Sequence, residues 1–142
     1  MTMKKAEEVA CMLLRVVAGV MFFQAGAMGI LGWFGGLPAP MGPTAPLLSQ
    51  VGIGKLLELV GGIAIALGLF TRPVAFVLSG EMAVAYWQFH ADFKAPNGLW
   101  PIVNHGGEAV LFCFIFLFMA ARGGGECSLD AWMRRRREAP HR

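Results

Sequence analysis

Charge is scarce in this sequence, and that scarcity excludes most soluble proteins. Asp, Glu, Lys and Arg make up 15% of the 142 residues, whereas a soluble domain carries about 25%. Hydrophobic residues make up 56% and the mean hydropathy is +0.59, which is more apolar material than a soluble core of this chain length can bury. The formal net charge of +3 comes almost wholly from the C-terminal tail. We therefore expect an integral membrane protein that does not bind nucleic acid.

Paired cysteines are also lacking. Cys11, Cys113 and Cys127 have no CxxC spacing, so the sequence indicates neither a disulfide framework nor a dithiol redox centre. There is no Rossmann glycine fingerprint and no haem motif. If the protein takes part in redox chemistry, its electrons must come from a substrate or from a partner protein.

Four apolar segments are about as long as a bilayer-spanning helix, which needs about 20 residues. They cover residues of about 9–31, 51–70, 74–91 and 104–121. They predict an all-α protein: a four-helix antiparallel transmembrane bundle that forms one domain over residues 1–142. The basic tail, 122–142, is expected to contain a short interfacial helix. A cleaved signal peptide is the alternative for the first segment, but Arg15 and the length of that segment disfavour it.

Lys and Arg residues predict the topology of these segments. They gather in the N-terminus, in the turn after the second segment and in the C-terminal tail, whereas the two Pro/Gly-rich loops contain only Lys94. Positive residues mark the cytoplasmic side of a membrane protein. Both termini are therefore predicted to be cytoplasmic.

The second segment and the turn that follows it, Gly54–Arg72, contain a stripe of glycines. Gly54, Gly61 and Gly68 recur every seven residues, and such a stripe lets another helix approach closely in lipid. Glu58 lies about 40° from Gly54 on the same helix, so it is expected to face the bundle interior. A charge there needs a partner, a proton or a cavity, and Lys55 lies one turn away.

Several further polar residues are expected in the outer half of the bundle, close to this pair. We predict that Glu58, Glu81 and Glu108 face inward, and that His105 and Glu108, spaced i, i+3, share one face. Three buried carboxylates cannot all be charged, so at least one, most readily Glu81, should be protonated at neutral pH. The candidate catalytic residues are Glu58, Glu81, Glu108 and His105, and the candidate substrate-binding residues are Lys55, Gln88, His90, Asn104 and Trp100.

Each of these residues also has a purely structural interpretation. Lys55 and Glu58 can form an ion pair that only neutralises two charges. His90 can be an interfacial residue, because it points away from the face of Glu81 on a helix. Arg15, near the end of the first segment, can extend its guanidinium to the headgroups.

Short motifs resemble those of the DoxX family of small four-helix bacterial membrane proteins. They are LLRVVAGVMFF, GWFGG, ELVGGIAIALGLFTRPVA, NHGGE and SLDAW, and together they extend over about residues 9–133. In that family the first helix usually carries His-Gly and a Lys, where this chain has Ala25, Gly26 and Gly29. The resemblance implies relatives of a membrane thiosulfate:quinone oxidoreductase subunit.

Two classes of function follow from these features. The first is a subunit of a quinone-linked oxidoreductase, in which the carboxylates, His105 and interfacial tryptophans bind a quinone and exchange protons. Its partners would be a redox protein or further copies of the chain. The second is a non-enzymatic membrane module that stabilises or recruits a partner protein. A small transporter or a metal site at His105 and Glu108 is a weaker third possibility.

Overall fold

Helices account for all the regular structure among residues 2–138, the part of the chain that the computed structural model describes. This confirms the predicted all-α class. The end of the predicted tail, residues 139–142, lies outside the described residues. The elements are α1 (Met3–Leu31), the short 3-10 helix η1 (Trp33–Gly35), α2 (Gln50–Leu67), α3 (Thr71–Ala85), the π-helical turn η2 (Tyr86–His90), α4 (Pro101–Asn104), α5 (Gly107–Arg122) and α6 (Leu129–Glu138).

The helix boundaries differ from the predicted segments at several places. The first helix begins at Met3, earlier than predicted. The third continues without a break through η2 to His90. The fourth predicted segment is divided, because His105 adopts a left-handed conformation with φ of 57° that ends α4. Helix α5 therefore starts only at Gly107.

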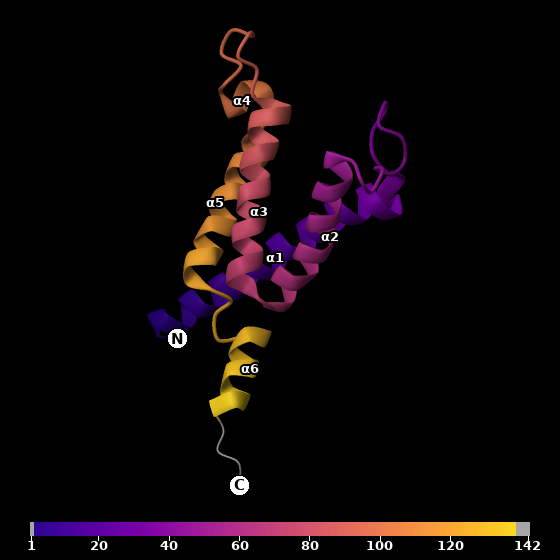
Figure 1. Ribbon diagram of the computed structural model, residues 1–142. Helices are drawn as coiled ribbons and strands as arrows, with labels where there is room; N and C mark the ends of the chain where they lie inside the picture. Colours follow the sequence, from indigo (N-terminus) through magenta and orange to yellow (C-terminus); the bar gives the residue numbers. More distant parts are fainter. Residues whose placement is uncertain (1, 139–142) are drawn as a thin grey trace.

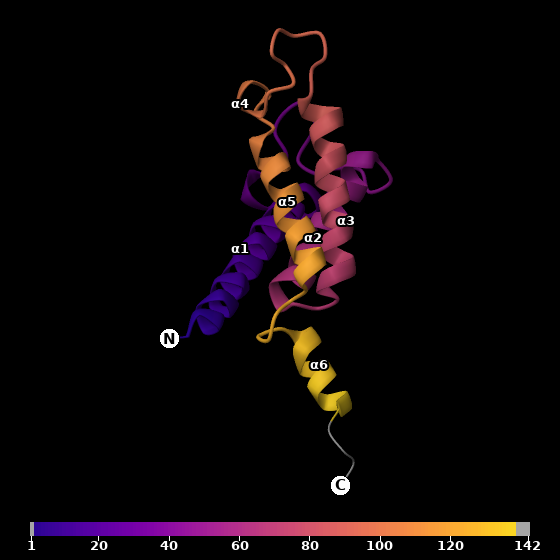
Figure 2. The same ribbon diagram turned by 90° about the vertical axis from the view of Figure 1, so that its left-hand side faces the viewer.

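The four long helices form two pairs that lie against each other. Helix α1 packs along α2, α3 packs along α5, and α2 also contacts α3. Successive long helices run in opposite directions (Figure 1). The start of α1, the turn between α2 and α3, and α6 lie near one end, and the loop that contains α4 lies at the other (Figure 2). We call these the tail end and the loop end.

Glycines bring α1 and α2 into backbone contact. A Cβ added at Gly26 would overlap the backbone of Leu59, and one added at Gly62 would overlap the backbone of Phe23. In lipid, where burial of apolar surface drives association only weakly, such close contact is a main source of helix pairing. The glycine stripe predicted on α2 faces α3 and not α1. Gly54 lies beside Glu81 and Gly61 lies beside Leu78, both on α3.

Aromatic and aliphatic side chains fill the space between the two pairs. Phe22 of α1 packs edge-to-face on Phe116 of α5, with ring centroids 4.5 Å apart. The buried core consists of Ala18, Phe22, Ile65, Ala75, Leu78, Met82, Tyr86, Ala109, Phe116 and Met119. Large apolar side chains also cover the outside; Phe76 is 67% exposed and Phe114 63%. An apolar exterior of this kind is typical of a surface that faces lipid.

Within residues 2–138, two helices are long and apolar enough to cross a membrane by themselves. These are α1, with 29 residues, and α2, with 18. Helix α5 has 16 residues, about 24 Å at 1.5 Å per residue. The same rise gives about 30 Å for the helical run of α3 and η2.

Candidate functional site

An ion pair lies between α2 and the rest of the bundle. Lys55 Nζ donates to both carboxylate oxygens of Glu58, at 2.9 Å to Oε1 and 2.7 Å to Oε2. The two residues are one helical turn apart, so α2 alone brings them together. Glu58 is only 7% exposed. Its predicted inward orientation and its pairing with Lys55 are both confirmed.

Glu81 of α3 reaches toward the same part of α2. A Cβ added at Gly54 would lie 3.1 Å from Glu81 Oε1, so the missing side chain of this glycine leaves room for the carboxyl group. Glu81 Oε2 is buried, and it has no hydrogen-bond partner among residues 2–138. Lys55 and Glu58 are both close enough to act on Glu81 electrostatically. We call Lys55, Glu58 and Glu81 the intramembrane cluster.

The intramembrane cluster has more acidic than basic groups. One ammonium group faces two carboxyl groups, and it already makes two short bonds to Glu58. A second unpaired charge in an apolar environment is costly, so the remaining carboxyl group needs a proton or a ligand. The orphan oxygen of Glu81 is therefore where the cluster can exchange a proton or a hydrogen bond.

An apolar groove lies next to the intramembrane cluster on the α2–α3 seam. Its volume is about 260 Å³. Gly61 and Leu78, which line it, are one helical turn from Glu58 and Glu81 respectively, and Val60, on its wall, is 59% exposed. The groove is therefore open at the surface of the protein. Its lining residues are Leu57, Val60, Gly61, Ala64, Pro73, Val74, Val77 and Leu78.

Asn104 and His90 hold the loop at the loop end of the bundle. Asn104 Nδ2 donates to the Gly98 carbonyl at 2.9 Å, and its Oδ1 accepts from the Gly106 N–H at 2.8 Å. His90 Nδ1 lies 3.3 Å from the Asn104 carbonyl. Tyr86 adds a hydrogen bond from its hydroxyl to the Leu99 carbonyl. These contacts give both predicted site residues a structural task.

The structure does not place His105 and Glu108 in the intramembrane cluster. Both side chains are exposed, so the predicted inward orientation of Glu108 is not what the structure shows. The prediction assumed one continuous helix, but α5 begins only at Gly107, which puts Glu108 in its first turn. There a carboxylate is stabilised by the free N–H groups of the helix start and needs no buried partner.

Gln88 and Trp100 lie at the loop end as well. Gln88 is exposed and its side-chain amide bonds that of Gln50, at the start of α2. Trp100 precedes α4 and is 64% exposed. Neither side chain belongs to the intramembrane cluster.

Arg15 has a structural role that the sequence did not indicate. Its predicted extension to the headgroups is wrong, because the side chain is only 4% exposed. Its guanidinium donates to the carbonyls of Ile65 at 2.9 Å and Ala66 at 2.6 Å, and to that of Cys127 at 2.7 Å. It thereby satisfies free carbonyls at the end of α2 and fastens the tail to α1.

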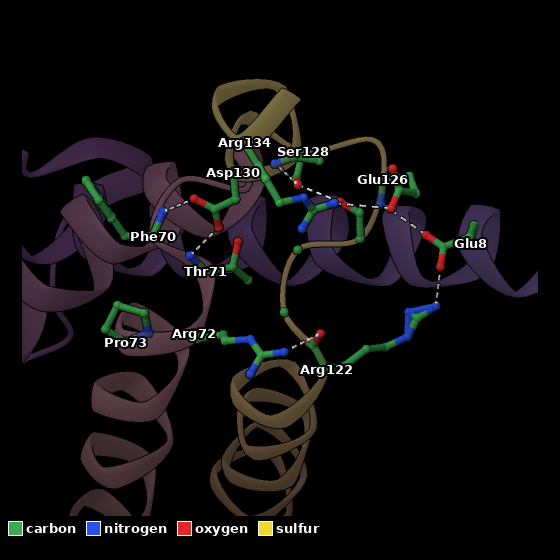
Figure 3. Close-up of a pocket in the computed structure, with 14 residues that line it drawn as sticks. Glu8, Phe70, Thr71, Arg72, Pro73, Arg122, Glu126, Ser128, Asp130 and Arg134 are labelled. Carbon is green, nitrogen blue, oxygen red and sulfur yellow. Dashed lines mark hydrogen bonds and ion pairs between the residues drawn. The ribbon is translucent and has the colours of Figure 1, made fainter. Parts of the chain in front are cut away.

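The SLDAW motif completes this attachment of the tail (Figure 3). Asp130 accepts from the N–H groups of Phe70 and Thr71, both at 2.8 Å, and so caps the start of α3. Ser128 accepts from the Ala131 N–H at 3.2 Å and caps α6. We call Arg15, Ser128 and Asp130 the tail latch. The motif was visible in the sequence, but the contacts of Asp130 with α3 join residues 59 and 60 positions apart.

A polar cleft of about 470 Å³ lies beside the tail latch. Its charged groups are mostly paired with each other: Arg122 binds Glu8 at 2.7 Å, and Arg134 lies 3.4 Å from Glu126. Asp130 is occupied by α3, as Figure 3 shows. No group of three or more His, Cys, Asp or Glu side chains within residues 2–138 is placed to hold a metal ion.

Comparison with known proteins places this architecture among bacterial membrane proteins. The family model described as DoxX matches residues 10–91. An uncharacterized protein of Haemophilus influenzae is 39% identical, over 82% of this chain and 85% of its own length. The Escherichia coli inner membrane proteins YphA and YqjF are 30% and 31% identical, over 88% and 90% of this chain and 91% and 95% of theirs. No solved structure matches.

Proposed function

The chain belongs to the DoxX family and is a bacterial inner membrane protein, and on this basis we propose that it is a membrane subunit of a quinone-linked oxidoreductase. The observation that carries the proposal is the orphan Oε2 of Glu81. Lys55 and Glu58 both act electrostatically on Glu81, and an apolar groove begins one helical turn away along α3, at Leu78. A quinone has the same two parts, a headgroup that accepts hydrogen bonds and an apolar tail.

The chemistry assigned to each residue follows from its position. Lys55 holds a positive charge and N–H donors close to Glu81, and Glu58 keeps that charge balanced. Glu81 holds a proton on the carboxyl group that has no protein partner, and can donate it to a bound carbonyl oxygen. The quinone itself supplies the acceptor of two electrons and two protons. The apolar groove would hold the apolar chain of the quinone away from water.

We also propose that α1, α2, the run of α3 and η2, and α5 are four spans with both termini in the cytoplasm. The tail end supports this assignment because it gathers most of the Lys and Arg residues, whereas Lys94 is alone in the loops at the loop end. A reporter that is active only outside the cytoplasm should be silent when fused to the C-terminus. An active fusion would reverse the topology.

A partner must deliver the electrons. The sequence has no CxxC pair, Rossmann fingerprint or haem motif, and the proposed role therefore requires a redox protein or an electron-donating substrate at the membrane surface. The chain contributes the quinone site and its anchorage in the bilayer.

Quinone binding tests this proposal directly. The protein, purified in mild detergent, should retain quinone extractable by organic solvent, and should bind added quinone saturably. Glu81→Leu removes this donor and should weaken that binding by about fivefold, since one neutral hydrogen bond contributes about 1 kcal/mol. Glu108→Leu, which alters an exposed carboxylate, is the matched control and should bind as the unaltered protein does. Equal affinity of both variants would contradict the assignment of Glu81.

The alternative is a non-enzymatic module that stabilises a partner. It is favoured by the number of polar side chains that serve only the fold: Arg15, Asn104 and Asp130 all bind backbone groups of this chain. If the purified protein neither retains nor binds quinone, this function takes the place of the first.

A further inference from the structure

Helix α6 presents two contrasting faces. On one face Ala131 is only 1% exposed and Asp130 binds the start of α3. On the other face Trp132 is 46% exposed and Leu129 is 37% exposed. The helix is therefore docked by its first turn, and Trp132 and Leu129 remain partly exposed on its opposite face.

A run of four arginines follows these apolar residues. Arg134 and Arg135 lie 3.4 Å and 3.1 Å from the carboxylate of Glu126. Arg136 lies over the ring of Trp132, 4.2 Å from its centroid. No ion pair within residues 2–138 involves Arg136 or Arg137. The part of α6 beyond its docked turn thus combines an exposed aromatic ring with unneutralised positive charge.

The attachment of α6 sets its distance from the membrane surface. Its first turn bonds Phe70 and Thr71, at the turn between α2 and α3. Both figures show the helix continuing from that end of the bundle. With ten residues it is about 15 Å long, so its arginines lie within about 15 Å of the turn between α2 and α3.

We propose that α6 is a binding surface for anionic phospholipids. Tryptophan is favoured at the level of the headgroups, and arginine binds phosphate through two parallel N–H donors. Arginine clusters next to a membrane-spanning segment attract anionic lipid. Trp132 and Leu129 enter the headgroup layer, and Arg136 and Arg137 bind phosphates there. This surface is separate from the intramembrane cluster and does not depend on quinone binding.

Quenching of Trp132 fluorescence by brominated lipids tests the proposal in the full-length protein. Trp33, Trp87 and Trp100 are replaced by phenylalanine, and the protein is reconstituted in vesicles of phosphatidylcholine and phosphatidylglycerol. One lipid or the other carries bromine, at equal mole fraction. Brominated phosphatidylglycerol should quench more strongly, because each arginine near the surface favours anionic lipid roughly fivefold.

Two charge variants separate α6 from the general positive charge of the tail end. In R136Q/R137Q the preference for phosphatidylglycerol should nearly disappear. In the protein with the unaltered tail, 1 M salt should weaken the same preference. K4Q/K5Q removes two charges from α1 and should retain the preference. Equal quenching by the two lipids overturns the proposal. Absence of quenching by either lipid also overturns it, and would instead fit a basic helix that docks an acidic protein.

Discussion

The tail latch and the intramembrane cluster are two buried polar regions that differ in how far their hydrogen-bonding groups are satisfied. In the tail latch, Arg15 binds carbonyls of α2 and of the tail, and Asp130 binds two N–H groups of α3. Among residues 2–138, Arg15 Nε is the one buried side-chain atom of the tail latch without a partner, whereas the intramembrane cluster leaves a carboxyl oxygen, Glu81 Oε2, unbonded. Satisfied groups of this kind stabilise the fold, whereas an unsatisfied carboxyl group weakens it. The comparison supports an architectural role for the first region and the proposed quinone binding for the second.

Removing Arg15 should have the largest effect on stability. Arg15→Met leaves buried carbonyls of α2 and of the tail without a donor, and we expect the free energy of unfolding to fall by about 3 kcal/mol. Thermal unfolding in detergent, followed by circular dichroism, measures the change. Arg137→Met, at an exposed position, is the control and should melt as the unaltered protein does. If both variants melt alike, the tail latch does not stabilise the protein.

Glu58→Gln should be the next most harmful change. It leaves the ammonium group of Lys55 without its carboxylate partner, with an expected loss of about 2 kcal/mol. The double variant Lys55→Met/Glu58→Met removes both charges and should recover most of the lost stability in the same thermal assay. A double variant as unstable as Glu58→Gln alone would show that packing, and not charge, explains the loss.

Asp130→Ala removes the cap of α3 and should destabilise the protein by about 1 kcal/mol. The effect is expected to be smaller than that of Arg15→Met because two hydrogen bonds, from the N–H groups of Phe70 and Thr71, are lost and not three. The same melts serve as the measurement, with Glu138→Ala as a control at the exposed end of α6. No difference between the two would mean that the contact of α6 with α3 adds nothing to stability.

Glu81→Gln should have the smallest effect on stability, within about 0.5 kcal/mol, because the amide is close in shape to a protonated carboxyl group. Because the amide can still donate a hydrogen bond, quinone binding should be largely retained in Glu81→Gln and lost most strongly in Glu81→Leu. Melts in detergent and binding titrations of the two variants test both expectations. A loss of stability greater than that of Glu58→Gln would reverse the roles assigned to the two residues.

Local patterns were enough to predict the pairing of Lys55 with Glu58. Both residues are on one helix, and a spacing of three positions places them on one face whatever the rest of the chain does. The inward orientation of Glu81 followed similarly from its position within an apolar helix. The helix start at Gly107 was not predicted, because the left-handed turn at His105 leaves no mark in an apolar pattern. The inward orientation predicted for Glu108 was therefore wrong.

The sequence by itself determined the helical class and membrane character of this protein, since both depend on composition and on periodicity within single segments. Only the tertiary structure decided which polar residues are satisfied. Arg15 donates to the carbonyl of Cys127, 112 positions later in the chain. Asp130 accepts a hydrogen bond from the N–H group of Phe70, 60 positions earlier. Glu81 Oε2 has no hydrogen-bond partner among residues 2–138, and this too depends on the packing of α3 against another helix. Its surroundings come from another helix, and hydrogen bonds between distant segments depend on how helices pack and on no spacing along the chain.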